Sequence, residues 1–313
     1  MENNKLRLRF VKDYNLPINV FDEEMFKYYT ELYDFFPRER WESLKSMIGE
    51  KYGGNVERWL EYCANVRDTA IESVIGSEKY KEFNERNPLF PMENRKSIGE
   101  HSCYNQETDG CNFVSIDLKK ANFQAMKYMG VIDDETYDDF IERNGGDDYI
   151  KGSKYLRQVI FGKMNPGRTV SVEKHIMNTV MSVSDEVLPM EFKLYSQNSD
   201  ELVYKQWAGF YGEMKVICPV IEKVVNEKFG IDVRVEFVQI RKLPIVNVNG
   251  NNVDAYVRKN LITGEETLKK ASTTFYPQIY KLWKGMEIED RDLVFFFEDQ
   301  LCRFNNPLII KEQ

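Results

Sequence analysis

The stretch that most constrains the fold runs over residues 112–129 and reads NFVSIDLKKANFQAMKYM. Residues 113–116 alternate as in a strand, an acid, Asp117, follows, and residues 120–128 carry apolar side chains at helical spacing. This order predicts a carboxylate at the mouth of a sheet, where it could bind a cation. The alternative is a helix N-cap, because an aspartate side chain readily accepts hydrogen bonds from the first turn of a helix.

A second acidic position lies in residues 191–205, EFKLYSQNSDELVYK, which read as strand, tight turn and strand. Asp200 and Glu201 stand at the bend. In a small antiparallel sheet the end of one strand and the adjacent hairpin turn fall side by side, so we expect Asp117 and Asp200 to lie close together. Mg²⁺ would relieve the repulsion between their carboxylates. Plain turn chemistry is the alternative, since Asn, Ser and Asp all favour turns.

The charge of the chain is unevenly distributed. A formal net charge of -8 and a pI near 5.2 argue against a general nucleic-acid coat, because affinity for phosphate comes mainly from cations. Residues 133–148 hold eight acids and one base, whereas residues 151–174 hold one acid and six bases. These bases are Lys151, Lys154, Arg157, Lys163, Arg168 and Lys174. A helix over residues 155–162 would present Lys154, Arg157 and Phe161 on one face, as a local phosphate-binding surface.

The bulk properties predict a globular protein of the cytoplasm, including the cytoplasm of an infected host. Hydrophobic residues make up 42% of the 313, and no apolar run approaches the roughly 20 residues of a membrane span. Five scattered cysteines indicate free thiols in a reducing compartment. His101, Cys103 and Cys111 invite a zinc interpretation, but structural zinc takes four closely spaced ligands, so an ordinary loop is favoured.

The motifs resemble those of the right-hand nucleic-acid polymerases over residues 100–204. DLKKANFQAM, from Asp117, looks like motif A. KYLRQVIFGKMNP, from Lys154, is similar to motif B of the small protein-primed phage enzymes of family B, in which a lysine stands seven residues before an aromatic-Gly-Lys. Arg157, four residues before Phe-Gly, fits the family A version.

Motif C has two counterparts in the same segment. SDELVY, from Ser199, looks like the family A motif, and Asn-Ser-Asp is close to the Asp-Thr-Asp of family B, with Asn in place of the first acid. The spacing also resembles that of reverse transcriptases, although their Asp-Asp pair is Asp-Glu here. The order of the motifs, a basic helix between two acids, is more specific than any one of them.

The resemblance implies a role for each matching residue. Asp117 and Asp200 become ligands of two Mg²⁺ or Mn²⁺ ions, assisted by the Leu118 carbonyl, and Glu201 becomes a secondary acid. The residues that bind the incoming nucleoside triphosphate become Lys154, Arg157 and Lys163, with Phe161 stacked near the nascent base pair and Asn122 near the sugar. These families place a bulky or acidic group at position 122, so Asn122 predicts weak discrimination against ribonucleotides.

A hairpin follows these motifs and carries Tyr256, Arg258 and Lys259. Two interpretations stay open for it: a grip on the primer backbone, as in family B, or a strand edge protected by charge.

The expected fold class is α+β, with a palm-type small antiparallel sheet backed by helices. We expect a helical N-terminal region at 1–99 after a short leader containing Pro17. A palm follows at 100–240, with a short fingers insertion at about 131–185, and a thumb-like α+β region at 241–313. Residues 131–149 are expected to form a solvated acidic helix.

The expected function is template-directed nucleotidyl transfer on a primer-template, resembling that of a DNA polymerase and without a proofreading exonuclease. A compact enzyme of this kind suggests the replication of a virus or mobile element. Two alternatives remain. One is a reverse transcriptase or a template-independent nucleotidyltransferase. The other is a non-catalytic palm-like subunit that binds nucleic acid, which leaves room for a protein partner.

Overall fold

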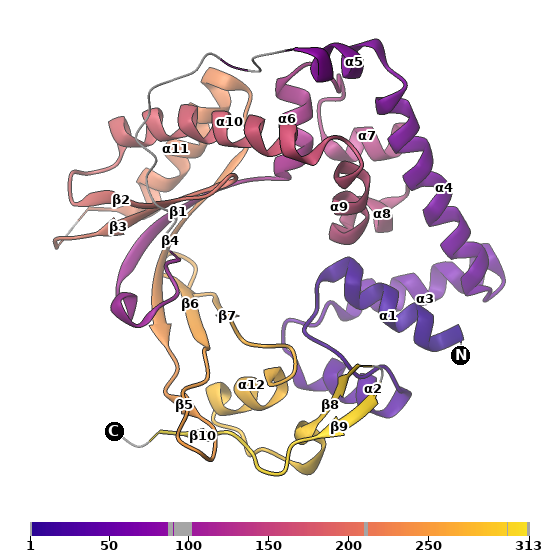
Figure 1. The fold of residues 1–313 in the computed structure, drawn as a ribbon, viewed down its shortest axis with the longest axis vertical. Coiled ribbons are helices and arrows are strands. Elements are labelled where there is room, and N and C mark those ends of the chain that lie inside the picture. Colours follow the sequence, from indigo (N-terminus) through magenta and orange to yellow (C-terminus); the bar gives the residue numbers. More distant parts are fainter. Residues whose placement is uncertain (1, 87–89, 91–101, 210–211, 299, 312–313) are drawn as a thin grey trace. The chain divides into compact units, whose positions relative to one another are not determined.

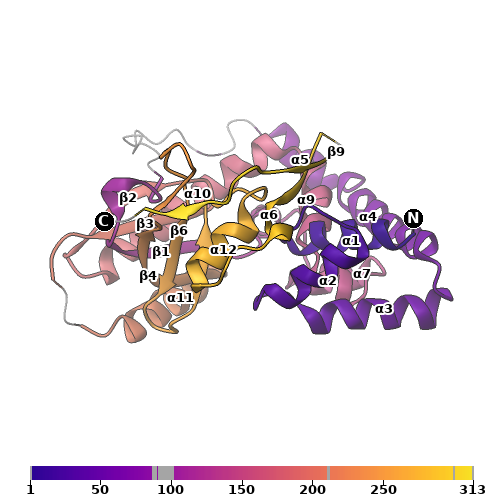
Figure 2. The ribbon, with the colours of Figure 1, turned by 90° about the horizontal axis from the view of Figure 1, so that it is seen from below.

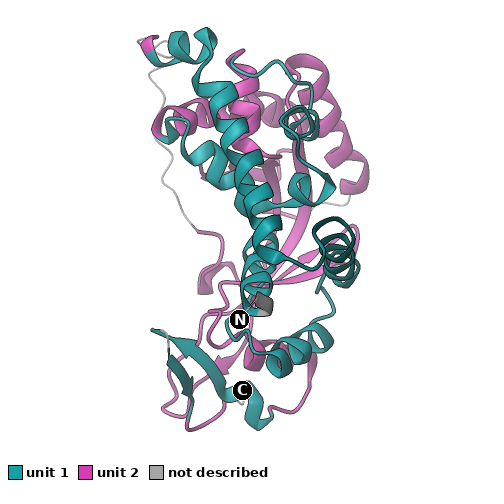
Figure 3. Ribbon diagram, turned by 90° about the vertical axis from the view of Figure 1, so that its right-hand side faces the viewer, with its two compact units in different colours: residues 1–84, 131–166, 289–304 teal, residues 85–130, 167–288, 305–313 magenta. Residues whose placement is uncertain are grey.

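A computed structural model (Figure 1) describes residues 2–86, 90, 102–209, 212–298 and 300–311. The contacts cluster into two compact units, coloured in Figure 3, and each unit is assembled from three separate stretches of chain. Unit 1 comprises residues 1–84, 131–166 and 289–304, and unit 2 comprises residues 85–130, 167–288 and 305–313. The two units cut across the three ranges expected from the sequence: the range 131–185 divides between them at residue 166. The functional division into palm, fingers and thumb stays a prediction.

Unit 1 is mainly helical. Its helices are α1 (Glu2–Tyr14), α2 (Glu23–Leu32), α3 (Arg38–Tyr52), α4 (Val56–Ile75), α5 (Glu78–Glu85), α7 (Tyr137–Arg143), α8 (Asp148–Gly152) and α9 (Lys154–Gly162). Helices occupy most of residues 2–86, and a separate N-terminal region at 1–99 stays a prediction. The expected leader is wrong. Residues 2–14 form α1, because Leu6, Phe10 and Val11 recur at helical spacing and are buried.

A buried carboxylate ties α1 to α8 and α9. Asp13 has no exposed surface, and its carboxylate accepts hydrogen bonds from Arg9 Nε at 2.9 Å and from the Tyr149 hydroxyl at 2.8 Å. The Ser153 hydroxyl also donates to it. These bonds compensate the carboxylate for the water it lost on folding.

The acidic segment before α9 is shorter and more buried than expected. Instead of a solvated helix over 131–149, α7 covers only residues 137–143 and buries Tyr137, Phe140 and Ile141. Its first turn begins at Thr136, whose side chain accepts from the Asp139 amide and so caps the helix. One face of α7 therefore belongs to the core of unit 1, and only the other face carries exposed acids.

Unit 2 is built on a six-stranded antiparallel sheet with the strand order β2-β3-β1-β4-β6-β7. Its strands are β1 (Asn112–Leu118), β2 (Phe192–Gln197), β3 (Glu201–Gln206), β4 (Val233–Lys242), β6 (Tyr256–Asn260) and β7 (Glu266–Lys269). The accompanying helices are α6 (Ala121–Tyr128), α10 (Pro166–Val187), α11 (Met214–Phe229) and α12 (Tyr276–Lys284). This architecture confirms the α+β class and the antiparallel sheet with helices.

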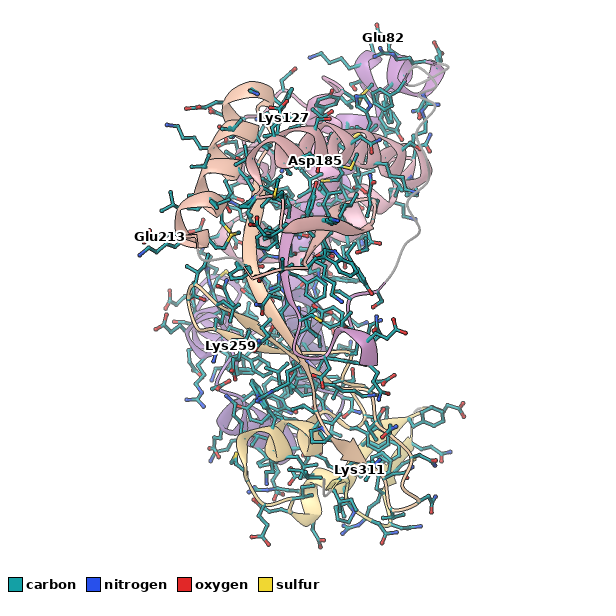
Figure 4. The ribbon with its side chains drawn as sticks, turned by 90° about the vertical axis from the view of Figure 1, so that its left-hand side faces the viewer. Glu82, Lys127, Asp185, Glu213, Lys259 and Lys311 are labelled. Carbon is teal, nitrogen blue, oxygen red and sulfur yellow. The ribbon has the colours of Figure 1, made fainter. Side chains whose placement is uncertain are left out.

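The helices α10 and α11 pack on one face of the sheet, above β1 to β4 in Figure 1. The Tyr204 hydroxyl of β3 donates to Asp185 of α10 at 2.9 Å, and Figure 4 labels Asp185. The Val235 amide of β4 donates to Glu222 of α11 at 2.8 Å. The registers of β1 with β3 and with β4 place Val235 on the same face as Tyr204, so the strand neighbours of both residues point to the other face.

That other face is apolar at one end and charged at the other. The apolar end is a cluster in which residues of the loop 102–111 cover the sheet. The buried members of the cluster are Phe113, Val203, Val238, Ile240 and Tyr256, and Cys103, Tyr104, Cys111 and Tyr195 pack against them. The remaining end of the same face, where β1 terminates, holds the charged residues of the candidate site.

The C-terminal residues divide between the units. In unit 2, α12 packs on a second small core beside the paired strands β5 (Ile245–Val246) and β10 (Ile309–Ile310). Figure 2 shows the ribbon of α12 from below. In unit 1, β8 (Val294–Phe297) forms a hairpin with β9 (Gln300–Arg303). The strand expected at 292–297 is therefore present, but it is not the final one.

Candidate active site

The register of the sheet brings the sequence-predicted acids together. Asp117, near the end of β1, lies directly opposite Glu201 of β3 on one side and Arg234 of β4 on the other. Directly opposite residues in antiparallel strands project from the same face, so these three side chains share a row. The Leu118 amide donates to the Asp200 carbonyl at 2.8 Å, which fixes the hairpin turn beside the end of β1.

Asp117 is not a helix cap. The helix α6 begins at Ala121, and its N-cap is Lys120, whose side chain makes no capping hydrogen bond. Lys120 takes a φ of 51°, in the left-handed region that a lysine adopts only at a cost of about 1 kcal/mol or more. The sharp reversal at Lys120 lets the helix start after the strand has ended, and it leaves the Asp117 carboxylate on the sheet.

Gln124 of α6 holds the two strand ends in place. Its buried side-chain amide donates to the carbonyls of Lys119 at 2.5 Å and Asp232 at 2.6 Å, and it accepts from the Asp232 amide at 2.8 Å. The Lys119 amide also donates to the Asp232 carbonyl at 3.0 Å, so this side chain and a backbone bond together join the end of β1 to the start of β4. The sequence interpretation missed Gln124, because no local pattern distinguishes it from any polar residue of a helix.

The residues of the hairpin turn both form the turn and carry carboxylates of the candidate site. The Asn198 amide donates to the Glu201 carbonyl at 2.8 Å, which leaves Ser199 and Asp200 at the tip. The turn interpretation of this segment is therefore right as local structure. It does not compete with a role for the carboxylates, because Glu201 begins β3 and projects beside Asp117.

Six residues form what we call the charged face: Ser115, Asp117, Glu201, Arg234, Glu236 and Arg258. Arg234 Nη2 lies 3.1 Å from Asp117 Oδ2, and Arg234 Nε lies 3.4 Å from Glu236 Oε2. Arg258 Nη2 lies 2.9 Å from the same Glu236 oxygen. The Ser115 hydroxyl donates to Glu201 Oε1 at 2.6 Å. The alternation in VRVEFVQIRK signals that Arg234 and Glu236 share a face, but nothing in it indicates their partner strand.

The charged face shifts the pKa values of its acids in opposite directions. Burial raises the pKa of Asp117; the charge of Arg234 opposes this rise, and the charges of Glu201 and Asp200 add to it. Burial alone would also raise the pKa of Glu236, but the hydrogen bond and charge of Arg258 outweigh it and lower that pKa. Asp117 is therefore the acid whose negative charge the protein compensates less completely.

A further acid, Glu173 of α10, lies on the helix side of the sheet. It is 3% exposed, and its Oε1 accepts from the side-chain amide of Asn122 at 2.7 Å. Burial, with the charge of Asp200 as the next cause, raises the pKa of Glu173 to about 7. Asp200 thus acts electrostatically on both Glu173 and Asp117. Asn122, which the sequence placed near the sugar, is fixed by a residue that the sequence interpretation did not select.

The four residues expected to contact triphosphate and base pair belong to unit 1, whereas the acids belong to unit 2. Lys154 and Lys163 are exposed. Arg157 is half-buried, with its guanidinium 5.8 Å from the centre of the Tyr137 ring. Phe161 is buried, and its ring packs against Tyr137 and Phe140. Core packing alone accounts for Phe161, so it does not share an exposed face with Lys154.

In the hairpin that carries Tyr256, Arg258 and Lys259, one side chain is buried and the two basic side chains are paired with acids. Tyr256 is buried in the apolar cluster, and Arg258 is bound to Glu236. Lys259, labelled in Figure 4, is exposed and lies 3.5 Å from Glu266 of β7. Of the three, only Lys259 keeps an exposed cation at the surface of this hairpin.

The donor chemistry at the end of β1 suits Mg²⁺ or Mn²⁺, which prefer carboxylate and carbonyl oxygens. Two of the carboxylates are already engaged, Asp117 by Arg234 and Glu201 by Ser115. Within the residues that the structure describes, no group of three or more His, Cys, Asp or Glu side chains is arranged to hold a metal ion. The oxygens fit the ion chemically, and the carboxylates would have to exchange partners to bind it.

The zinc interpretation gains nothing from the structure. His101 lies outside the described residues. Cys103 and Cys111 are free thiols in the loop that covers the apolar cluster, and burial raises the pKa of Cys103 to about 11.

The comparisons with known proteins provide no assignment. No protein-family model matches the chain, and the search of curated proteins finds no significant match. Over the described part of the chain, no helix is both long enough and apolar enough to cross a membrane. The likeness to polymerases therefore rests on the motifs and on the geometry that joins two of them.

Proposed function

We propose that this protein is a template-directed nucleic-acid polymerase that resembles DNA polymerases and lacks a proofreading exonuclease. The observation that carries the proposal is the register of β1 and β3, which sets Asp117 opposite Glu201 with Asp200 at the adjoining turn. The motifs A and C that the sequence suggests are thus neighbours in one antiparallel sheet. Helices pack on its other face, as expected for a palm.

The proposed chemistry uses these acids to position metal ions. Asp117, Asp200 and the Leu118 carbonyl would hold Mg²⁺ or Mn²⁺, which when bound activates the primer 3′-hydroxyl and stabilises the leaving pyrophosphate. Glu201, oriented by Ser115, adds negative charge beside them. Phosphoryl transfer depends on positioning and charge neutralisation, so the hold of Gln124 on the strand ends contributes directly to the geometry.

The residues proposed to bind the nucleotide follow from the resemblance. Lys154, Arg157 and Lys163 are proposed to neutralise the incoming triphosphate, and Asn122, fixed by Glu173, is proposed to face its sugar. The partners are a primer-template and nucleoside triphosphates, with room for a protein subunit, and the proposed location is the cytoplasm, including that of a virus-infected host. Reverse transcription and template-independent tailing are the nearest alternatives, because they use the same acids.

One observation favours a different class of function. The Asp117 carboxylate is paired with Arg234. A palm-like subunit that binds nucleic acid without catalysing transfer would show the same pairing.

Primer extension with labelled dNTPs or NTPs and Mg²⁺ separates these functions. We expect Asp117→Ala and Asp200→Ala each to lose roughly 10³-fold or more of the templated extension rate, about 4 kcal/mol of transition-state stabilisation. Asp254→Ala is the matched control, because Asp254 is an exposed aspartate beside Lys242, at the opposite end of β4. Similar rates with dNTPs and NTPs would agree with Asn122 at the sugar, and a strong preference for dNTPs would count against that role.

The other outcomes point elsewhere. Extension without template would favour the tailing enzyme. Inactivity of the wild type and of all variants, with nucleic acid still bound, would favour the non-catalytic subunit. Full activity of Asp117→Ala would remove the candidate site from the reaction.

A further inference from the structure

We propose that Arg234 is a built-in cation that competes with the divalent metal for Asp117, so that metal binds only as Arg234 moves away. This inference rests on the proposed function, since it describes how the same site would be regulated.

The position of Arg234 is set by the backbone. It lies directly opposite Asp117 in the β1–β4 register, and its Nη2 is 3.1 Å from Asp117 Oδ2. A guanidinium is charged at every physiological pH and occupies the side of the carboxylate from which it donates. A divalent cation at that oxygen would face repulsion from Arg234 unless the side chain moved.

Arg234 also contacts a second acid, Glu236. Its Nε lies 3.4 Å from Glu236 Oε2, two residues along the same strand, and the same oxygen also receives Arg258. Glu236 can therefore retain Arg234 after Asp117 has released it. Because the Arg234 side chain already contacts both acids, the loss of Asp117 leaves its contact with Glu236 in place.

The pair that must break is weak enough to be displaced. The side chain of Arg234 is 57% exposed and that of Asp117 is 34% exposed. Ion pairs at such exposure contribute about 0–1 kcal/mol, because water screens them. Displacing Arg234 should therefore weaken metal binding by about 5-fold at most, which is a tuning of affinity rather than a block.

Direct titration of Mn²⁺ binding, followed by the electron paramagnetic resonance of the free ion, tests the proposal without any turnover. We expect Arg234→Gln to bind Mn²⁺ about 5-fold more tightly than wild type, and Arg234→Lys to be intermediate. Arg241→Gln should equal wild type, since Arg241 is exposed on the same strand but alternates to its other face. Asp117→Asn should lose the binding.

The outcomes separate this inference from the proposed function. Unchanged or weaker binding in Arg234→Gln, with Asp117→Asn still impaired, overturns the competition and leaves the metal site intact. No Mn²⁺ binding by any of the proteins overturns the metal site, and the inference with it.

Primer extension adds a second readout for the same variants. Competition predicts that Arg234→Gln needs less metal for half-maximal rate. A lower maximal rate with unchanged Mn²⁺ binding would instead make Arg234 a contact of the nucleic acid, and the competition would be wrong. Arg234→Lys retains the charge and serves if Arg234→Gln folds poorly.

Discussion

Asp13 in unit 1 and Asp117 in unit 2 are both aspartates paired with an arginine, and burial raises the pKa of each. Their surroundings differ. Asp13 has no exposed surface and accepts from Arg9, Tyr149 and Ser153. Asp117 is 34% exposed, and the one contact found for its carboxylate among the described residues is with Arg234.

The difference separates a structural acid from an acid available for binding. The carboxylate of Asp13 accepts from Arg9 of its own helix and from Tyr149 and Ser153, and the last two bonds are lost only if α1 separates from α8 and α9. Asp117 is held by one exposed side chain and stands beside two further acids, Asp200 and Glu201. A partly exposed carboxylate at a strand end, with one partner among the described residues, retains lone pairs for a ligand, and that favours Asp117 as the acid available for binding.

The largest effect on stability is expected at Asp13, and it tests whether the two aspartates differ as described. Asp13→Ala should lower the free energy of unfolding by about 3–5 kcal/mol, because it leaves Arg9 and two buried hydroxyls without their acceptor. Asp117→Ala should change it by no more than about 1 kcal/mol, as for an exposed pair. Urea unfolding of both variants measures the contrast, and equal losses would show that Asp117 is also a structural acid.

An intermediate effect on stability is expected at Glu173, a buried acid for which no arginine partner is found among the described residues. Its pKa is raised to about 7 from 4.5, so the protonated form stabilises the folded chain. That contribution is complete below about pH 4.5 and is lost as the pH rises through 7, a decline of up to about 3 kcal/mol. Glu173→Gln should lack this decline and gain stability relative to wild type at pH 8.

Unfolding free energies of wild type and Glu173→Gln at pH 4.5, 6 and 8 provide the measurement. Glu186→Gln, an exposed glutamate farther along the same helix, is the matched control and should follow wild type. Parallel curves for wild type and Glu173→Gln would mean that Glu173 is not held protonated by burial.

The smallest effect concerns the residue that fixes Asp117 in place. Gln124→Leu keeps the size of the side chain but leaves the Asp232 amide and the Lys119 carbonyl without their Gln124 partner, so we expect a loss of about 1–3 kcal/mol. The Asp232 carbonyl still accepts from the Lys119 amide, so the strand ends stay paired but lose their side-chain brace, and Mn²⁺ binding should weaken. Thermal unfolding and Mn²⁺ titration check this, and unaltered values in both would assign Gln124 no role in positioning the site.

The sequence predicts the part of the site that is local. The pattern of residues 112–129 predicts the strand, the acid and the helix, and the hairpin at 191–205 follows from its turn residues. Their pairing follows as well, because a short hairpin has few places to add to a small sheet.

The parts that depend on long-range register are not readable from one sequence. Arg234 meets Asp117 only because β4 pairs with β1 at one register out of several, and Glu173 meets Asn122 only through the packing of α10. For Phe161 the local pattern itself led to a wrong prediction. Its helical spacing matches Lys154 and Arg157, but an aromatic ring at the edge of a core is drawn inward by the area it buries.

The interleaving of the two units determines when each can form. Unit 1 requires residues 289–304 to add its last hairpin, and unit 2 requires residues 309–310 to complete the pairing of β5 with β10. Neither unit can therefore be finished during synthesis until these late segments have left the ribosome. The interleaving also means that no single cut yields either unit as one fragment, so a split version of this protein would have to reassemble from pieces that are each incomplete.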